Sequence, residues 1–252
     1  IFKSNNNHNS LIEKFLKGKE MDLINEIRDY LLSLGVCSVG FADISEITPI
    51  KGLNTGIVFY INHEAENLNT VVEGPTYAYL EGHRELNRKL DEIAIKGEEY
   101  LIEKGFNAYG QTTRRIVDTI ENNSAELPHK TIATLAGLGW IGKSALFITK
   151  EYGPALRLSS ILTDAQLEYG IPIDSSLCGE CMICQEACPG GAISGKAWNS
   201  SLSRDDFYNH KKCEETAKKL SKKAFLWEDT MCGICMNICP HAQKFIKKEL
   251  NK

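Results

Sequence analysis

The sequence predicts an α/β (α+β) protein in two parts, with alternating helices and strands followed by a small cysteine-rich part. Over about the first 170 residues, segments with helical spacing of apolar side chains alternate with short β-branched runs. Beyond Asp174 the chain is rich in cysteine and punctuated by glycine and proline. Of its 252 residues, 42% are hydrophobic and 25% are charged, which excludes the disordered and fibrous classes.

Each expected element follows from the spacing of its apolar residues. Ile24, Ile27 and Leu31 recur at helical intervals, and Gly35 ends that pattern. The run GIVFYI is β-branched and aromatic, which favours a strand, and Pro128 suits the first turn of a helix. We expect helices over 24–34, 83–104 and 128–135, and strands over 36–42, 56–61, 106–112, 145–149 and 156–162.

The N-terminal stretch carries no export signal. Residues 1–20 are polar, Asn-rich and amphipathic, unlike a signal peptide, and no run approaches the ~18 apolar residues of a membrane span. Ile1 is not a start methionine, and the regular pattern begins at Met21, which is a candidate native start. We therefore expect an N-terminal extension over 1–20 and a cytoplasmic protein without a membrane partner.

Nine cysteines are clustered: Cys37 stands alone, and the other eight lie between Cys178 and Cys239. In a chain without an export signal, such clustering indicates metal ligands rather than disulfides. The run over 178–189 has the spacing C-x2-C-x2-C-x3-C-P, by which bacterial ferredoxins hold [4Fe–4S] clusters. Three thiolates at this spacing wrap one cluster, and the fourth, before the proline, reaches the other cluster.

The second cysteine run, over 232–240, lacks one cysteine of that pattern, and Cys213 completes it. A pair of four-cysteine zinc sites is the alternative, but such sites need neither the third cysteine at this spacing nor the terminal Cys-Pro. Cys37 falls in an expected apolar strand and is interpreted as a core residue. We assign one cluster to Cys178, Cys181, Cys184 and Cys239, and the other to Cys188, Cys213, Cys232 and Cys235.

Residues 137–144 (GLGWIGKS) match both the phosphate-loop and the dinucleotide-binding patterns. Both mechanisms need a strand before the glycines and a helix after them, so that the helix N-terminus faces the phosphates. Here the expected order is reversed, and Trp140 is bulky for a phosphate cradle. We therefore favour a glycine turn over an ATPase in which Lys143 binds phosphate.

Four ordered motifs carry a resemblance to a known family: 116–119 (IVDT), 136–144, 158–164 (LSSILTD) and the two cysteine runs. In these motifs the chain resembles the epoxyqueuosine reductase family and, more distantly, the reductive dehalogenases. The resemblance implies a nitroreductase-like cofactor-binding domain over 21–174 and a two-cluster bacterial-ferredoxin-like domain over 175–252. It also implies that electrons pass through two [4Fe–4S] clusters to a cobalamin.

The same resemblance assigns roles to single residues. Asp118 matches an aspartate that donates a proton; the alternative is a helix cap or a salt bridge to Arg114 or Arg115. For His83 the alternative is an ordinary histidine at the start of a helix. The chain has no Asp-x-His-x-x-Gly sequence, so no histidine ligand to cobalt is expected. The residues expected near the cofactor are Tyr77, Tyr79, His83, Ser144, Leu158, Ser159, Ser160, Thr230, Met231 and Gly233.

We therefore predict an oxygen-sensitive iron–sulfur oxidoreductase that acts on an unidentified small substrate. A low-potential protein of the ferredoxin or flavodoxin type is the expected electron donor. The alternatives are an electron-transfer protein without substrate chemistry and an enzyme that holds FMN, because nitroreductase-like folds also serve flavins.

Charge and length argue against a nucleic-acid partner. The net charge is −4, and the sequence lacks the helical-repeat domain with which queuosine-forming relatives grip tRNA, so few phosphate contacts are expected. From Ser203 onward, 11 lysines and arginines outnumber 7 acidic residues. This basic stretch is interpreted as a solvated face or as a docking patch for an acidic redox partner.

Overall fold

The computed structural model describes residues 21–117 and 125–252. Its centre is a sheet of four strands in the order β1-β2-β6-β3, and every neighbouring pair is antiparallel. The edge strand β3 is short, so β6 has a partner strand on both sides only over residues 161–163. The strands are β1 (Ser38–Asp43), β2 (Thr55–Asn62), β3 (Ala108–Gly110) and β6 (Leu156–Thr163).

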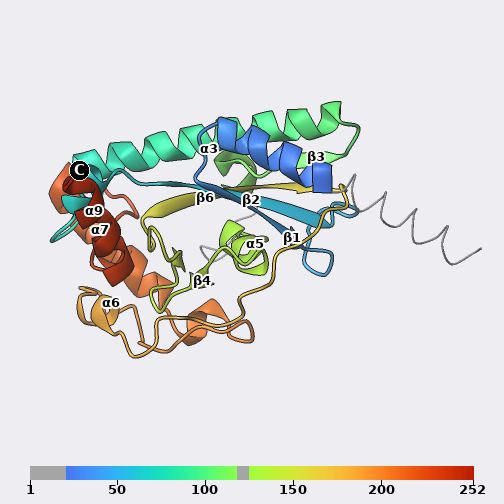
Figure 1. Ribbon diagram of the computed structural model, residues 1–252. Coiled ribbons are helices and arrows are strands. Elements are labelled where there is room, and N and C mark those ends of the chain that lie inside the picture. The colour runs from blue at the N-terminus through green and yellow to red at the C-terminus, as the bar shows by residue number, and fades with distance from the viewer. Residues whose placement is uncertain (1–20, 118–124) are drawn as a thin grey trace, which may run out of the picture.

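One face of the sheet is covered by the helix over 21–33 and by the long helix α3 (Tyr77–Glu103), as Figure 1 shows. Alternate strand residues point to this face, because successive side chains of a strand lie on opposite sides. Ile57, Phe59 and Ile161 are fully buried there against the two helices. This contact forms the larger apolar core.

The opposite face is covered by α5 (His129–Leu135) and by the two short strands β4 (Trp140–Ile141) and β5 (Phe147–Ile148). Val58 and Leu162 follow Ile57 and Ile161 in the sequence and therefore point to this side, where they are fully buried. The sheet therefore lies between two apolar layers, in agreement with a mixed helix-and-sheet class.

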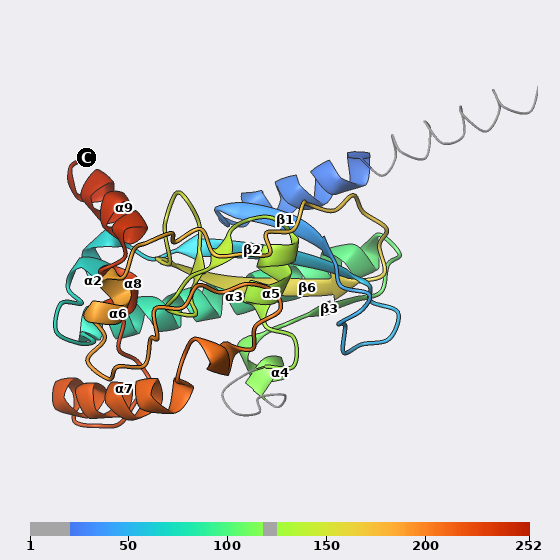
Figure 2. The ribbon, with the colours of Figure 1, turned by 90° about the horizontal axis from the view of Figure 1, so that it is seen from below.

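The cysteine-rich part gathers at one end of the sheet (Figure 2). It shares an apolar cluster with the sheet part, in which Met236, Cys239 and Phe245 pack with Trp140 and Ile148. The two parts therefore bury surface against each other. The helices of this part are α6 (Ile183–Glu186), a 3₁₀ turn (Arg204–Asp206), α7 (His210–Phe225), α8 (Ile234–Asn237) and α9 (Pro240–Leu250).

The expected elements are present, with shifted ends. α3 begins six residues earlier than expected, because Thr76 caps its N-terminus by accepting a hydrogen bond from the Tyr79 amide at 3.3 Å. The strands expected over 106–112 and 145–149 are shorter. The sequence analysis missed α2 (Ala65–Asn69), α4 (Thr113–Val117) and β4. Within the described ranges, no helix has the length and apolar character needed to cross a membrane.

The glycine-rich segment has the reversed order that the sequence predicts. Helix α5 precedes the glycines, and the β4–β5 hairpin follows. A Cβ atom on Gly139 would lie 2.2 Å from the carbonyl oxygen of Ile148, so glycine is required there for close backbone packing. No helix N-terminus follows the glycines to face a phosphate.

Candidate functional site

Two adjoining cavities lie between the sheet part and the cysteine-rich part. The cluster-side cavity, about 560 Å³, is lined by Tyr79 and His83 of α3 and by four cysteines. The α5-side cavity, about 440 Å³, is lined by His129 and Lys130 of α5 and by the apolar residues around Phe147. Their common wall is formed by Asn87, Leu146, Arg157 and Met236.

A first group of cysteines is identified because the charge of one thiolate raises the pKa of another; its members are Cys178, Cys181, Cys184 and Cys239. Burial, followed by the charges of Cys178, Cys239 and Cys181, raises the pKa of Cys184 to about 11. The pKa of Cys239 is likewise raised by burial and by Cys178 and Cys181. These four side chains therefore lie close to one another, and crowded thiolates of this kind need a cationic centre to be stable.

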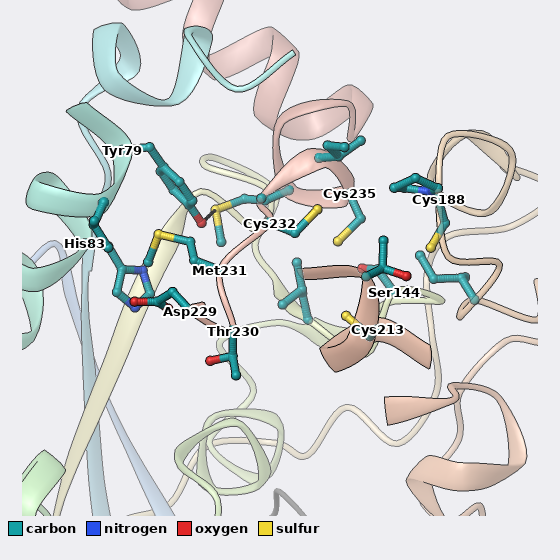
Figure 3. A pocket seen from close by; sticks show the side chains of 18 of the residues that line it. Tyr79, His83, Ser144, Cys188, Cys213, Asp229, Thr230, Met231, Cys232 and Cys235 are labelled. Carbon is teal, nitrogen blue, oxygen red and sulfur yellow. Dashed lines mark hydrogen bonds between the residues drawn. The ribbon is translucent and has the colours of Figure 1, made fainter. Parts of the chain in front are cut away.

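The second group lies on the wall of the cluster-side cavity (Figure 3). Burial, and then the charges of Cys232 and Cys213, raises the pKa of Cys235. Cys188 also raises the pKa of Cys213 and of Cys232. Within the described residues, no three His, Cys, Asp or Glu side chains converge on a point that would hold a single metal ion. Cys184 of the first group also raises the pKa of Cys235, so the two groups adjoin, and the division into two ligand sets stays a prediction.

Lys143, the lysine of the glycine-rich motif, binds the first cysteine loop. Its side chain is 5% exposed, and its Nζ donates to the carbonyl oxygens of Gly179 at 2.8 Å and Cys181 at 3.1 Å. A third contact, to the Met182 sulfur, is 3.2 Å long. The lysine thus acts on the protein backbone beside the predicted cluster and not on a nucleotide.

The aromatic residues at the start of α3 divide between two sides of the helix. Tyr79 and His83 are four residues apart, so they share a face, and both line the cluster-side cavity. Tyr77 is two residues from Tyr79 and turns away, packing on Phe225 and Trp227 with 54% of its surface exposed. Tyr77 therefore lines neither cavity, because helical geometry separates positions i and i+2, and its expected contact with the cofactor gains no support.

Four other expected cofactor residues line the cluster-side cavity: Ser144, Thr230, Met231 and Gly233. In Figure 3, Met231 lies between His83 and Cys232. Gly233 has a φ of 86°, and a Cβ atom there would lie 2.8 Å from the Tyr79 ring. Glycine thus lets the second cysteine loop approach α3.

The expected residues on β6 lie at the other cavity. Leu158 and Ser159 line the α5-side cavity. Ser160 is fully buried, donates to the Gln111 side chain and contacts His129 Nδ1 at 2.8 Å. It lines neither cavity, and its contact with the α5-side cavity is made through His129. Asp118 lies outside the described residues.

Three histidines near the cavities are held neutral. Burial, and then the charge of Arg157, lowers the pKa of His63 and of His129 to about 3 and that of His83 to about 2. His63 and His83 stack with ring centroids 5.8 Å apart. His63 Nε2 and His83 Nδ1 are buried without a hydrogen-bond partner in the described structure. Such orphaned atoms next to a cavity favour a polar ligand there.

The neutral His63 predicts a pH-dependent stability. The pKa of His63 in the folded protein lies below its unfolded value of 6.5, so the unfolded chain binds more protons. The contribution of His63 to the free energy of unfolding is therefore complete above pH 6.5 and is lost as the pH falls toward 3. Between pH 7.5 and 5.5, this one group should lower the free energy of unfolding by about 1.4 kcal/mol. Denaturant unfolding of wild type and His63→Gln should show that difference, and equal pH dependence in both proteins would contradict it.

Sequence reasoning missed the charged residues of the cavities, chiefly Arg157 and Lys130. Arg157 is a cation in the otherwise apolar and hydroxylic strand β6. Charged residues are rarely placed in central strands without a role, so this was the available signal. Lys130 follows Pro128 at the start of α5 and carried no comparable signal.

Comparison with known proteins relates this geometry to redox chemistry. Residues 177–242 match the 4Fe-4S double cluster binding domain. A curated epoxyqueuosine reductase from Synechocystis is 28% identical over 194 residues, which are 75% of this chain and 62% of that protein. The chain covers between 31% and 62% of the length of the first three such relatives.

Two solved structures share the fold. An epoxyqueuosine reductase crystallised with an epoxyqueuosine-modified tRNA stem loop matches with a TM-score of 0.58 and 19% identity, over 89% of this chain and 66% of that one. A reductive dehalogenase, whose structure suggests a mechanism for B12-dependent dehalogenation, matches with a TM-score of 0.63 and 18% identity, over 88% of this chain and 33% of that one. The flavin alternative gains no support from either.

These comparisons overturn one expectation and support another. The expectation that a nucleic-acid partner is absent is wrong for the relatives, since one binds a tRNA stem loop. Net charge averages over the whole chain, whereas phosphate contacts depend on local cations. Arg84, Lys130 and Arg157 are cations that line the cavities. The double-cluster domain, the curated relatives and the structural neighbours together support an epoxyqueuosine reductase-like family for this chain.

Proposed function

We propose that the chain is an iron–sulfur reductase in which two [4Fe–4S] clusters deliver electrons to a cobalamin in the two adjoining cavities. The cluster held by Cys178, Cys181, Cys184 and Cys239 receives electrons from a low-potential donor protein. The cluster held by Cys188, Cys213, Cys232 and Cys235 passes them to the cofactor. The substrate class proposed is a modified nucleoside in tRNA, as in the neighbour that binds a modified stem loop.

One observation carries the proposal: the second cysteine group and the α3 residues Tyr79 and His83 form walls of the same cavity. A cluster bound by those thiolates would border the cavity directly, without an intervening layer of protein. A cavity of about 560 Å³ has the size of a cofactor site. Electron transfer and substrate reduction would then occur in one place.

The residues present fit a corrin. The cluster-side cavity continues into the α5-side cavity of about 440 Å³, which together suit a large flat ligand with amide side chains. The partnerless His83 Nδ1 lies on the cavity wall and would pair with such an amide. When bound, cobalamin supplies a cobalt centre that is reduced to a low-valent, strongly nucleophilic state.

The chain's own side chains would bind and orient the cofactor. Tyr79 donates to the Met236 sulfur at 3.7 Å and packs on Gly233, which fixes the second cysteine loop against α3. Leu146 and Met236 form an apolar wall common to both cavities and exclude water. The neutral His63 and His83 add polar atoms without adding charge.

Asp118 is proposed as the proton donor, on the resemblance of its motif. Val117 and Ala125, which flank the range 118–124, line the α5-side cavity. Asp118→Asn should abolish turnover while leaving the iron content and cobalamin affinity unchanged. Full turnover in that variant would remove Asp118 from the mechanism.

The deciding experiment is an anaerobic titration of the cluster-loaded protein with cobalamin, followed by EPR spectroscopy of the cob(II)alamin form. We expect a tight complex with a five-coordinate, base-off spectrum, as the family resemblance implies, and no coupling to a histidine nitrogen, because the sequence has no Asp-x-His-x-x-Gly motif. The complex should then be reduced and incubated with an epoxyqueuosine-modified stem loop, and the released nucleoside should be analysed by mass spectrometry.

The two readouts separate cofactor from substrate. A base-off complex that leaves the stem loop unchanged would retain the cobalamin reductase and reject the tRNA substrate. Absence of cobalamin binding, with both clusters loaded, would reject the proposal and favour an electron-transfer protein.

A further inference from the structure

Arg157 lies in the wall common to both cavities and is only partly satisfied by the protein. Its Nε donates to Asn87 Oδ1 at 3.0 Å. No other hydrogen bond or ion pair of its guanidinium is formed among the described residues. Four N–H donors of a rigid planar group therefore lack a protein acceptor. A guanidinium away from bulk water is stable only when it is paired.

A second cation, Lys130, lines the α5-side cavity. Its Nζ donates to the Ala145 carbonyl oxygen at 3.0 Å. No carboxylate pairs with it in the described part of the chain. Burial lowers the pKa of Lys130 to about 8, so the amine is still mostly protonated at neutral pH.

The acidic residues of the two cavities are already engaged. Asp91 Oδ1 accepts from the backbone and the hydroxyl of Thr113, at 2.7 and 3.1 Å. Asp229 in the cluster-side cavity lies 3.8 Å from Arg84. The histidines at these walls are neutral. Arg157 and Lys130 thus both line the α5-side cavity, where Asp91 acts on Arg157 by its charge and no described carboxylate forms an ion pair with either cation.

We propose that Arg157 and Lys130 form a subsite for a phosphate-type oxyanion in the α5-side cavity, which both line. A guanidinium binds two oxygens of such an anion side by side, and the ammonium adds a third contact. The anion has two candidate sources: a phosphodiester of the substrate, or the phosphodiester in the nucleotide tail of cobalamin. The choice between sources rests on the proposed function, whereas the subsite itself rests on the two unpaired cations.

The test is a calorimetric titration of the cluster-loaded protein with inorganic phosphate. Arg157→Gln should weaken binding at least tenfold, since a charge-assisted bond contributes about 1.5–3 kcal/mol. Lys130→Met should weaken it less, and Arg157→Lys should recover part of the loss. The matched control is Arg88→Gln on α3: Arg88 pairs with Glu85, is 69% exposed and lines neither cavity.

A parallel titration with two corrins distinguishes the sources. Cobinamide lacks the nucleotide tail and its phosphodiester. If the cofactor brings the anion, Arg157→Gln will weaken binding of cobalamin but not of cobinamide. If the substrate brings it, both corrins will bind the variant as they bind wild type, and only phosphate binding will fall.

The failure of this proposal differs from the failure of the proposed function. If neither corrin binds wild type while phosphate still binds through Arg157, the subsite stands and the cobalamin proposal falls. If wild type binds no phosphate, or if Arg157→Gln binds it as well as Arg88→Gln does, the subsite is rejected. Retained clusters and an unchanged unfolding transition show that Arg157→Gln is folded.

Discussion

Replacing Cys235 by serine is expected to remove one cluster and to lower the iron content from about eight to about four per chain, because each cubane takes four thiolates. Burial, and then the charges of Cys232 and Cys213, raises the pKa of Cys235, so its thiol lies among the other predicted ligands of its group. A serine oxygen is a poor ligand for this cluster. Iron analysis and EPR of the reduced protein measure the loss, and turnover should disappear with it.

The matched control is Cys37→Ser. Cys37 belongs to neither group, and its thiol donates to Asn62 Oδ1 at 3.1 Å beside β1. This variant should keep full iron content and activity. Equal iron in wild type and Cys235→Ser would contradict the assignment of Cys235, and iron loss in Cys37→Ser would give Cys37 a ligand role.

Replacing Lys143 by methionine is expected to loosen the first cysteine loop and to lower the reduction potential of its cluster. Methionine keeps the apolar stem but donates no hydrogen bond, so the carbonyl groups of Gly179 and Cys181 lose their partner. A typical hydrogen bond contributes about 0.5–1.5 kcal/mol to stability. Loss of the nearby positive charge also disfavours the reduced, more negative cluster. An anaerobic redox titration followed by EPR measures the potential.

Lys196→Met is the control, because Lys196 is exposed in the same part of the chain. Its clusters should titrate as in wild type. If Lys143→Met also leaves both potentials and the unfolding transition unchanged, the lysine has no role in positioning the loop. If wild type binds ATP and Lys143→Met does not, the phosphate-loop interpretation would be restored.

Much of the fold follows from local sequence, because periodicity reports which face of an element is buried. The strands β2 and β6 are rich in apolar and β-branched residues, and they match the expected ranges within one residue. The two cysteine runs identified the cluster-binding part because metal ligation fixes the spacing of ligands along the chain. Such signals are local, and tertiary contacts do not override them.

The rest of the site depends on geometry that no local signal contains. Tyr77 and Tyr79 are equally aromatic in sequence, but their positions on α3 place one on the surface and one in the cavity. Arg157 and Lys130 lie 27 positions apart and meet only because β6 and α5 border one cavity. That neither cation has an ion pair with a described carboxylate is likewise a property of the folded surroundings.

The apolar cluster shared by the two parts of the chain implies an order of maturation. Cys239, a predicted ligand, and Met236, next to the predicted ligand Cys235, pack with Trp140 and Ile148 of the sheet part. Iron binding and folding of cysteine loops are thermodynamically linked, so loading iron would also complete this shared core and the cavity wall that Met236 forms. A newly made chain would therefore acquire its inorganic centres first and its organic cofactor second. Iron limitation would then reduce the capacity to retain the organic cofactor, even where that cofactor is abundant.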